Sequence, residues 1–174
     1  TPIFLPEIEK VLSEEKTLIQ ALANEQVLVD AVRVSNERNK NVSGSEIRAL
    51  DTEWIVSKTM TPFIKSFLEN KTAVFLLDFQ KQYPDYSELF VTDIYGLNVG
   101  QTNKTSDYYQ ADEAWWVDSF YGGEGKLAHS GIEFDESAQM VSISIYAPVI
   151  DPTTGNAIGV LKAVLDVSSL VDKL

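Results

Sequence analysis

Six side chains that could recognise a small molecule lie within nine consecutive positions of the 174-residue chain. Aromatic faces provide apolar contact area, and carboxylates provide charge and hydrogen-bond acceptors, so this mixture is typical of a pocket wall. We therefore predict that the segment 108–116 contacts a ligand. The six residues are Tyr108, Tyr109, Asp112, Glu113, Trp115 and Trp116.

A second group of polar candidates lies on a strand-type segment further along the chain. Apolar and polar residues alternate over 140–150, which predicts that Ser142, Ser144 and Tyr146 share one face of a strand. His129, the only histidine, and Lys126 are expected opposite this face and could together bind a small anion. A solvated strand face is the plainer alternative for the serines, as a surface position is for the histidine.

The elements that position these residues are predicted to be antiparallel strands. Segments 87–92 and 97–102 flank the turn Asp93-Ile94-Tyr95-Gly96 and form a hairpin. Segments 127–134, 140–150 and 158–167 are the other strand candidates. Five strands, with helices before and between them, predict an α+β fold around a five-stranded antiparallel sheet.

Before the first strand, the chain is predicted to be helical. The first forty residues are expected to form one long helix with two apolar stripes. One stripe would pack on the domain, and the other would either pack there too or meet the same helix of a second copy in a homodimer. The stripes are Leu5, Ile8, Leu12, Ile19, Leu22 and Val29, and Val11, Leu18, Ala21, Leu28 and Val32.

Local capping signals start two further helices. Ser43 and Glu46 form a capping box, and Thr61 followed by Pro62 is a typical N-cap and first-turn pair. Residues 71–82 are expected to form another helix, which ends before Pro84. We expect a helical region over 1–70 and a sheet-containing module over 71–174, which together form one domain.

Composition excludes several classes of function. The net charge of −12 and the pI near 4.4 argue against binding to nucleic acid or to an anionic membrane surface. The chain has no cysteine, so disulfides, thiolate nucleophiles and cysteine-ligated metals are excluded. No apolar run approaches the roughly 20 residues of a membrane span.

An enzyme is not expected. The chain has a single histidine and lacks the G-x-S-x-G, P-loop and H-E-x-x-H motifs. Asp107, Asp112 and Glu113 could supply oxygen ligands to calcium, but their spacing matches no known loop motif. We therefore predict no catalytic residue, no metal and no cofactor.

Three stretches of the second half together resemble the Cache family of PAS-like extracytoplasmic sensor domains. They are YPDYSELFVTDIYGLNVGQT, TSDYYQADEAWW and GIEFDESAQMVSISIYAPVIDPTTGNAIGVLKAVLDVSSL, which cover roughly residues 71–170. The resemblance implies a single PAS-like module that lies between two transmembrane helices of a prokaryotic receptor. Such receptors include sensor histidine kinases, chemoreceptors and cyclic-dinucleotide enzymes.

The resemblance also implies which residues meet the ligand. Tyr108, Trp115, Trp116 and Asp166 match positions that bind amino acids in related domains, but the arginine of that motif falls on Glu113. Without an arginine to hold a carboxylate in two hydrogen bonds, a cationic amine fits the aromatic segment better. A small carboxylate at Lys126 and His129 is the alternative. The competing hypothesis is a structural or dimerisation module whose pocket its own side chains fill.

Overall fold

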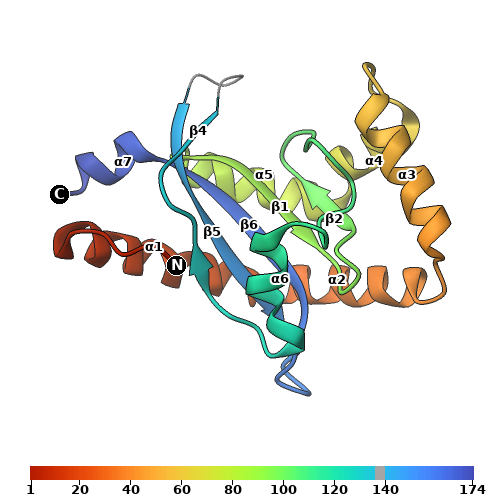
Figure 1. Ribbon diagram of the computed structural model, residues 1–174, viewed down its shortest axis with the longest axis horizontal. Helices are drawn as coiled ribbons and strands as arrows, with labels where there is room; N and C mark the ends of the chain where they lie inside the picture. The colour runs from red at the N-terminus through yellow and green to blue at the C-terminus, as the bar shows by residue number, and fades with distance from the viewer. Residues whose placement is uncertain (136–139) are drawn as a thin grey trace.

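One antiparallel sheet forms the centre of the molecule (Figure 1). The computed structural model describes residues 1–135 and 140–174. The strand order is β2-β1-β6-β5-β3, and β4 also pairs with β5. The strands are β1 (Tyr86–Thr92), β2 (Asn98–Gln101), β3 (Ala128–His129), β4 (Glu133–Asp135), β5 (Met140–Ile150) and β6 (Ala157–Asp166). The α+β fold is confirmed.

The expected strand over 127–134 is two short strands, so the sheet has six strands among the described residues rather than five. Ser130 interrupts the ladder between them, because its hydroxyl accepts a hydrogen bond from the backbone N–H of Ser144 at 2.9 Å. The hydroxyl in turn donates to the carbonyl of Gly131 at 2.6 Å. The backbone N–H of Ser130 still donates to the carbonyl of Ser144 at 2.8 Å, so the side chain replaces only one backbone acceptor before the chain leaves the ladder. The turn expected at 135–138 lies mostly outside the described residues.

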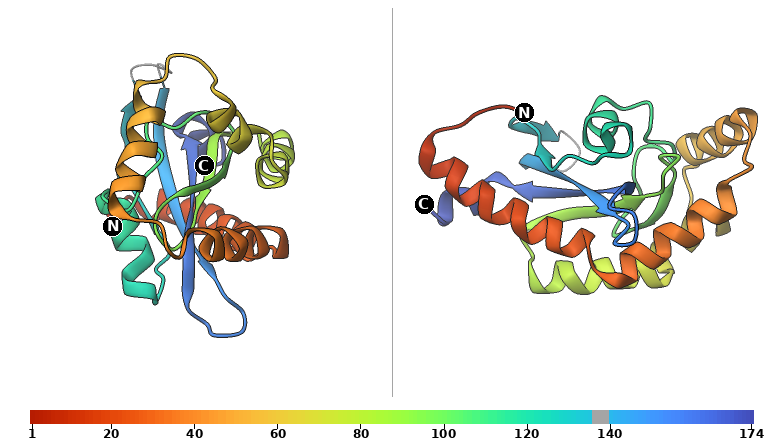
Figure 2. Two further views of the ribbon diagram at one scale, coloured as in Figure 1. Left: turned by 90° about the vertical axis from the view of Figure 1, so that its right-hand side faces the viewer. Right: turned by 90° about the horizontal axis from the view of Figure 1, so that it is seen from below.

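Two helices, α1 (Pro6–Ala23) and α2 (Gln26–Asn39), take the place of the single long helix that we expected. Glu25 has extended backbone angles (φ −61°, ψ 136°), and Asn24 ends α1. The two helices form a shallow V whose inner side faces the sheet (Figure 2). This bend lets both helices follow the twisted sheet, which a straight helix of this length could not do.

Both apolar stripes pack largely into the molecule's own core. Leu12, Ile19 and Val29 of the first stripe are buried, as are Leu28 and Val32 of the second. Ala21 of the second stripe is exposed. Helix α5 (Lys71–Gln82) lies beside α1 and α2 and completes the layer of helices on this face.

The helices α3 (Gly44–Val56) and α4 (Pro62–Glu69) form a second, smaller core at one end of the sheet (Figure 1). The capping box at Ser43 and the N-cap at Thr61 are both present. Trp54 is fully buried at the centre of this cluster, where its indole N–H donates to the carbonyl of Thr105. The cluster therefore anchors the loop that follows β2.

The opposite face of the sheet is covered by α6 (Ala114–Phe120), followed by a short 3-10 turn, η1 (Tyr121–Gly123). The chain ends in α7 (Val167–Asp172), which packs beside α1. Among the described residues, no helix is both long enough and apolar enough to span a bilayer.

Candidate functional site

Two strands place aromatic rings on either side of a lysine of the strand between them, on the sheet face beneath α6. In the strand register, Lys162 of β6 lies directly between Phe90 of β1 and Tyr146 of β5. Side chains of paired residues share a face, so all three point toward α6. Helix α6 adds Trp115, whose ring stacks on Tyr146 with centroids 5.1 Å apart and meets Phe90 edge-on at 5.9 Å.

The ammonium group of Lys162 occupies this aromatic cage. Its Nζ lies 5.0 Å from the ring centre of Trp115, 5.8 Å from Phe90 and 5.9 Å from Tyr146. Each distance is within the range over which a ring face attracts a cation. Of the aromatic residues that we expected to bind an external amine together, only Trp115 belongs to this cage, and the cage already holds a cation of the chain itself.

Lys162 and Phe90 are site residues that the motif analysis did not select. One signal was available: Lys162 is the only charged residue between Ala157 and Leu165 of the last strand. A lysine inside an apolar strand must place its ammonium in water or against compensating groups. Which groups compensate it depends on strand register, which these motifs do not reveal.

A cavity of about 440 Å³ lies beside the cage, between α6 and the strands β3 to β5. Trp115, His129 and Tyr146, which we selected from the sequence, come together in its wall, and so does Lys126. The cavity wall carries charges of both signs, because Asp118 and Glu133 also line it. The remaining lining residues are Thr1, Pro2, Tyr121, Ala128, Ser130 and Gly131.

His129 is a buried, uncharged part of this wall. Its Nδ1 lies 2.7 Å from the carbonyl oxygen of Ser130, so Nδ1 carries the proton and donates it there. The ring of Phe4 stacks on the imidazole at 5.6 Å. Burial, the largest effect, lowers the pKa of His129. The imidazole is therefore neutral at neutral pH, and Nε2 is available as an acceptor.

The serines of β5 support the cavity wall from behind. Ser144 is buried and is tied to Ser130 through its backbone N–H. Burial raises the pKa of Tyr146 to about 12, although hydrogen bonds with Ser144 and Ser130 work in the opposite direction. Tyr146 thus keeps its proton at neutral pH and can donate it. Ser142 is also buried and lies further along β5, opposite Asp166 in the register.

Tyr108 and Tyr109 lie away from the cage and the cavity. Helix α6 begins only at Ala114, so the two tyrosines belong to the preceding loop rather than to the helix that carries Trp115. The backbone N–H groups of both tyrosines donate to Asp51 of α3. Tyr108 is buried in the second core, where its ring packs against Trp54, Phe63 and Phe67.

Trp116 and Asp166 have structural contacts. The indole N–H of Trp116 donates to Thr92 Oγ1 at 2.8 Å, which joins α6 to β1. Its ring stacks on Phe120 at 4.7 Å. Asp166 caps α7 by accepting the backbone N–H of Ser168.

Glu113 belongs to a group of carboxylates with exposed Asp112 and half-buried Asp107. One oxygen from each lies within 4.8 Å of the others. Burial raises the pKa of Asp107, and the charges of Glu113 and Asp51 raise it further. Oxygens at this spacing could hold a cation, but exposed acidic groups are common without one.

Comparison with known proteins identifies the fold. No model of a protein family matches the sequence, and a search of curated proteins finds no similar sequence. Among solved structures, the extracellular domain of the candidate histidine kinase vpHK1S-Z8 matches with a TM-score of 0.53 and 13% identity. That match covers 95% of this chain and 54% of the other.

Two further structures are similar. The sensor domain of the V. cholerae histidine kinase DctB matches with a TM-score of 0.49 and 15% identity, covering 96% of this chain and 56% of that one. The ligand-binding domain of the Pseudomonas aeruginosa amino-acid chemoreceptor PctB, in complex with L-Arg, matches at 0.48 and 13%, covering 96% and 54%. This chain thus spans little more than half the length of these domains. The fold is similar to that of the extracellular domain of the histidine kinase vpHK1S-Z8, which agrees with the resemblance to the Cache family.

Proposed function

We propose that this chain is the extracytoplasmic ligand-sensing domain of a transmembrane signalling receptor. Among such receptors, we propose a sensor histidine kinase. The fold supports a sensor rather than an enzyme, because the similar structures are sensor and ligand-binding domains. The observation that carries the proposal is the cavity between α6 and β3 to β5. Its volume of about 440 Å³ lies within the range of small-molecule sites, roughly 300–1,000 Å³.

The ligand of this cavity carries a carboxylate. An isolated amine would approach the positive charge of Lys162, which already occupies the aromatic cage. Lys126 can instead neutralise an anionic group, and the hydroxyl of Tyr146 can donate to it, whereas neutral His129 offers only its Nε2 acceptor. Asp118 and Glu133 on the same wall could pair with an ammonium group elsewhere in the ligand. Of the two ligand classes that the sequence suggested, these contacts favour the carboxylate.

Binding would reach the N-terminal helix through the segment that precedes it. Thr1 and Pro2 line the cavity, and Phe4 stacks on His129 just before α1 begins. A ligand that favours one arrangement of this segment shifts the position of α1 relative to the sheet. In a receptor with flanking transmembrane helices, such a shift is the signal that crosses the membrane.

Calorimetry with a matched series of ligands tests the proposal. Butyrate, 4-aminobutyrate and butylamine share a carbon chain and differ only in their charged groups. We expect the two carboxylates to bind. Lys126→Gln should weaken binding about tenfold through the loss of one charge-assisted contact, and Trp115→Ala should weaken it through the loss of apolar contact area. Lys104→Gln, remote from the cavity, is the matched control. Binding of butylamine alone would overturn the ligand class.

The competing function is a structural module that responds to no ligand. The aromatic cage, which the chain fills with its own lysine, is the observation in its favour. No thermal shift from a broad panel of metabolites, combined with unchanged stability of the cavity variants, would support that module and contradict the sensor.

A further inference from the structure

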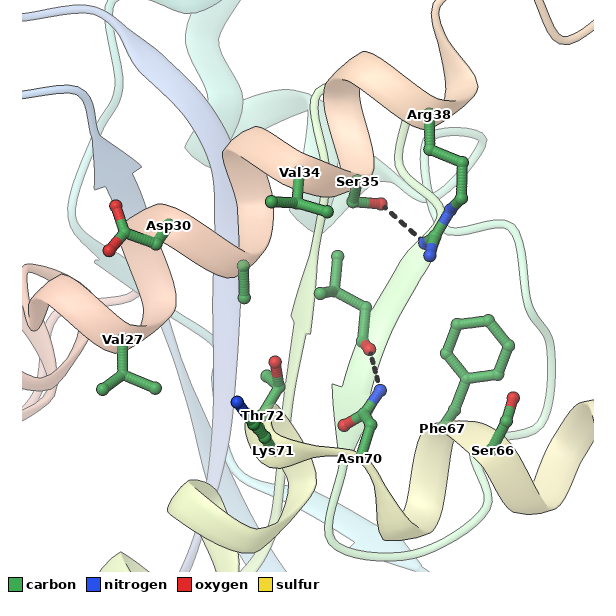
Figure 3. A pocket seen from close by; sticks show the side chains of 12 residues that line it. Val27, Asp30, Val34, Ser35, Arg38, Ser66, Phe67, Asn70, Lys71 and Thr72 are labelled. Atoms are coloured by element: carbon green, nitrogen blue, oxygen red, sulfur yellow. Dashed lines mark hydrogen bonds between the residues drawn. The ribbon is translucent and has the colours of Figure 1, made fainter.

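A second cavity lies on the other side of the molecule, between α2, α4 and the start of α5 (Figure 3). Its volume is about 670 Å³, which is larger than that of the cavity beneath α6. The sheet and the helices of the main core separate the two. The groove contains none of the residues that the sequence analysis selected as a ligand site.

The floor and one wall of this groove are apolar. Val27 and Val34 of α2 are 44% and 65% exposed, so two aliphatic side chains face solvent beside the groove. Phe67 of α4 and Val99 of β2 complete the apolar surface. An open apolar surface of this kind gains free energy when a ligand covers it.

Two cations border this apolar surface without a carboxylate partner. In the part of the chain that the structure describes, neither Arg38 nor Lys71 forms a salt bridge, whereas Arg33, Lys40 and Lys173 do. The one hydrogen bond of Arg38 to a neighbouring side chain is long, at 3.4 Å to Ser35 Oγ. Figure 3 shows its guanidinium directed into the gap between α2 and α4.

The acidic groups nearby are already engaged. Asp30 accepts a hydrogen bond from Gln26 at 2.7 Å and lies 3.6 Å from Arg33. Buried Asp93, behind Ser35, accepts four hydrogen bonds, from the side chains of Ser35 and Asn39 and from two backbone N–H groups. Arg38 and Lys71 are thus two cations at the groove that contact no carboxylate directly, in a protein with a net charge of −12.

We propose that this groove is a second ligand site, and that it takes an amphipathic carboxylate. The apolar part of the ligand covers Val27, Val34 and Phe67, and the carboxylate accepts two hydrogen bonds from the guanidinium of Arg38. The planar fork of arginine matches a carboxylate in this geometry. Lys71 adds attraction at the groove rim.

Calorimetry with octanoate, octanamide and octylamine on the 174-residue chain tests the proposal. These probes share their carbon number, so they separate charge from apolar contact. We expect octanoate to bind at least tenfold more tightly than octanamide, and octylamine not to bind. Arg38→Gln should weaken octanoate binding at least tenfold and Lys71→Gln less strongly, since one contact is a fork and the other a point charge.

Two controls decide where the probe binds. Lys104→Gln, whose side chain lines neither cavity, should leave octanoate binding unchanged. Lys126→Gln should leave the Arg38-dependent part of octanoate binding unchanged, so failure of one site is distinguishable from failure of the other. Amide chemical shifts should change at Ala31, Asn70 and Val99, which line the groove. Arg38 is exposed, so its replacement should leave the far-ultraviolet circular dichroism unchanged.

Several results would overturn the proposal. They are no octanoate binding, equal binding of the three probes, no effect of Arg38→Gln, or shift changes confined to the surroundings of Trp115. A second copy of the chain is the other occupant to consider. Concentration-dependent dimerisation that Val34→Glu abolishes would assign the groove to a dimer contact and contradict a ligand site.

Discussion

Lys162 changes the interpretation of the aromatic residues more than any other residue, because its ammonium group lies among them. Aromatic faces beside carboxylates in the segment 108–116 suggested an external cation, but the aromatic cage that the structure forms includes only Trp115 of that segment. The cage is built from Phe90, Trp115 and Tyr146 of three separate elements, and the ammonium of Lys162 fills it. The cage therefore contributes to folding stability, and the ligand site that we propose is the cavity beside it.

Removing the lysine should open the cage to an external amine. Lys162→Ala should lower the free energy of unfolding by about 1 kcal/mol, the value of a partly desolvated cation–π contact. Millimolar butylamine should then raise the melting temperature of the variant but not that of the wild-type protein, because the alkylammonium replaces the missing group. Lys126→Ala, whose ammonium lies 6.0 Å from the exposed ring of Tyr121, is the control. Equal shifts in all three proteins would contradict an occupied cage.

The raised pKa of Asp107 predicts that the stability of the protein depends on pH. Burial, together with the charges of Glu113 and Asp51, raises the pKa of this carboxyl group. The folded state therefore binds this proton more tightly than the unfolded state, and stability declines as the pH rises through the titration. Asp107→Asn should stabilise the protein at pH 7 by roughly 0.5 kcal/mol, a small value because the group is partly solvated.

The stabilisation by Asp107→Asn should disappear near about pH 3, where the carboxyl group is protonated in both states. Urea titrations at several pH values measure it. Asp118→Asn is a suitable control, since Asp118 is exposed and does not belong to the group of Asp107, Asp112 and Glu113. A benefit of Asp107→Asn that is independent of pH would show that repulsion among the carboxylates is not its cause.

At the scale of elements, the hairpin of β1 and β2 is fastened to both helical layers. Asp93 in its turn accepts hydrogen bonds from Ser35 and Asn39 of α2. On the other face, Thr92 accepts the indole N–H of Trp116 in α6. Local chemistry explains why Asp93 lies at this turn. The structure shows that the same turn is also the point where α2 contacts the sheet.

Gly159 of β6 marks the closest approach among these elements. A Cβ atom there would lie 2.1 Å from the carbonyl oxygen of Thr92 and 3.0 Å from Val32 of α2. Gly159→Ala should therefore separate β6 from β1 and lower the unfolding free energy by roughly 1–3 kcal/mol, as overpacking does. Chemical denaturation measures this loss.

Gly44→Ala is the matched control for Gly159→Ala. An added methyl at Gly44 meets only the end of the Arg48 side chain, at 3.3 Å, so we expect a neutral or slightly stabilising effect. Equal losses from the two substitutions would contradict the steric explanation.

At the scale of the whole molecule, a buried polar junction joins the two ends of the described chain. Glu15 of α1 is only 7% exposed and accepts a hydrogen bond from the hydroxyl of Tyr86, at 2.6 Å. Lys173, just beyond α7, forms a salt bridge with the same carboxylate. The carboxylate of Glu15 therefore links α1 to β1 and to the residue that follows α7. A shift of the sheet should displace α1 and α7 together.

Tyr86→Phe should weaken this junction. The substitution leaves an oxygen of a buried carboxylate without its donor, which costs roughly 2 kcal/mol. Hydrogen exchange should become faster in α7 and in the middle of α1. The exchange rates in α3 and α4 should change less. Tyr83→Phe, whose ring stacks on Phe79 at 4.6 Å, serves as the control. Unchanged exchange in α7 would exclude coupling through Glu15.

Much of the fold follows from patterns within a few residues. The capping groups at Ser43 and Thr61 start helices where we predicted, because a cap depends only on its own turn. The alternation over 140–150 places Ser144 and Tyr146 on one face for the same local reason. These patterns, with the motifs of the hairpin and the last strands, determine the α+β class and the resemblance to sensor domains.

The site depends on contacts between distant segments, which local patterns do not encode. Strand register places Lys162 between Phe90 and Tyr146, and a one-residue shift would turn it to the other face. The start of α6 at Ala114 separates Tyr108 from Trp115, although only six residues lie between them. The sequence alone determined the helix caps, the hairpin and the strand alternation, and with them the fold class. Only the tertiary structure decided which side chains meet, because their proximity results from pairing and packing across the whole chain.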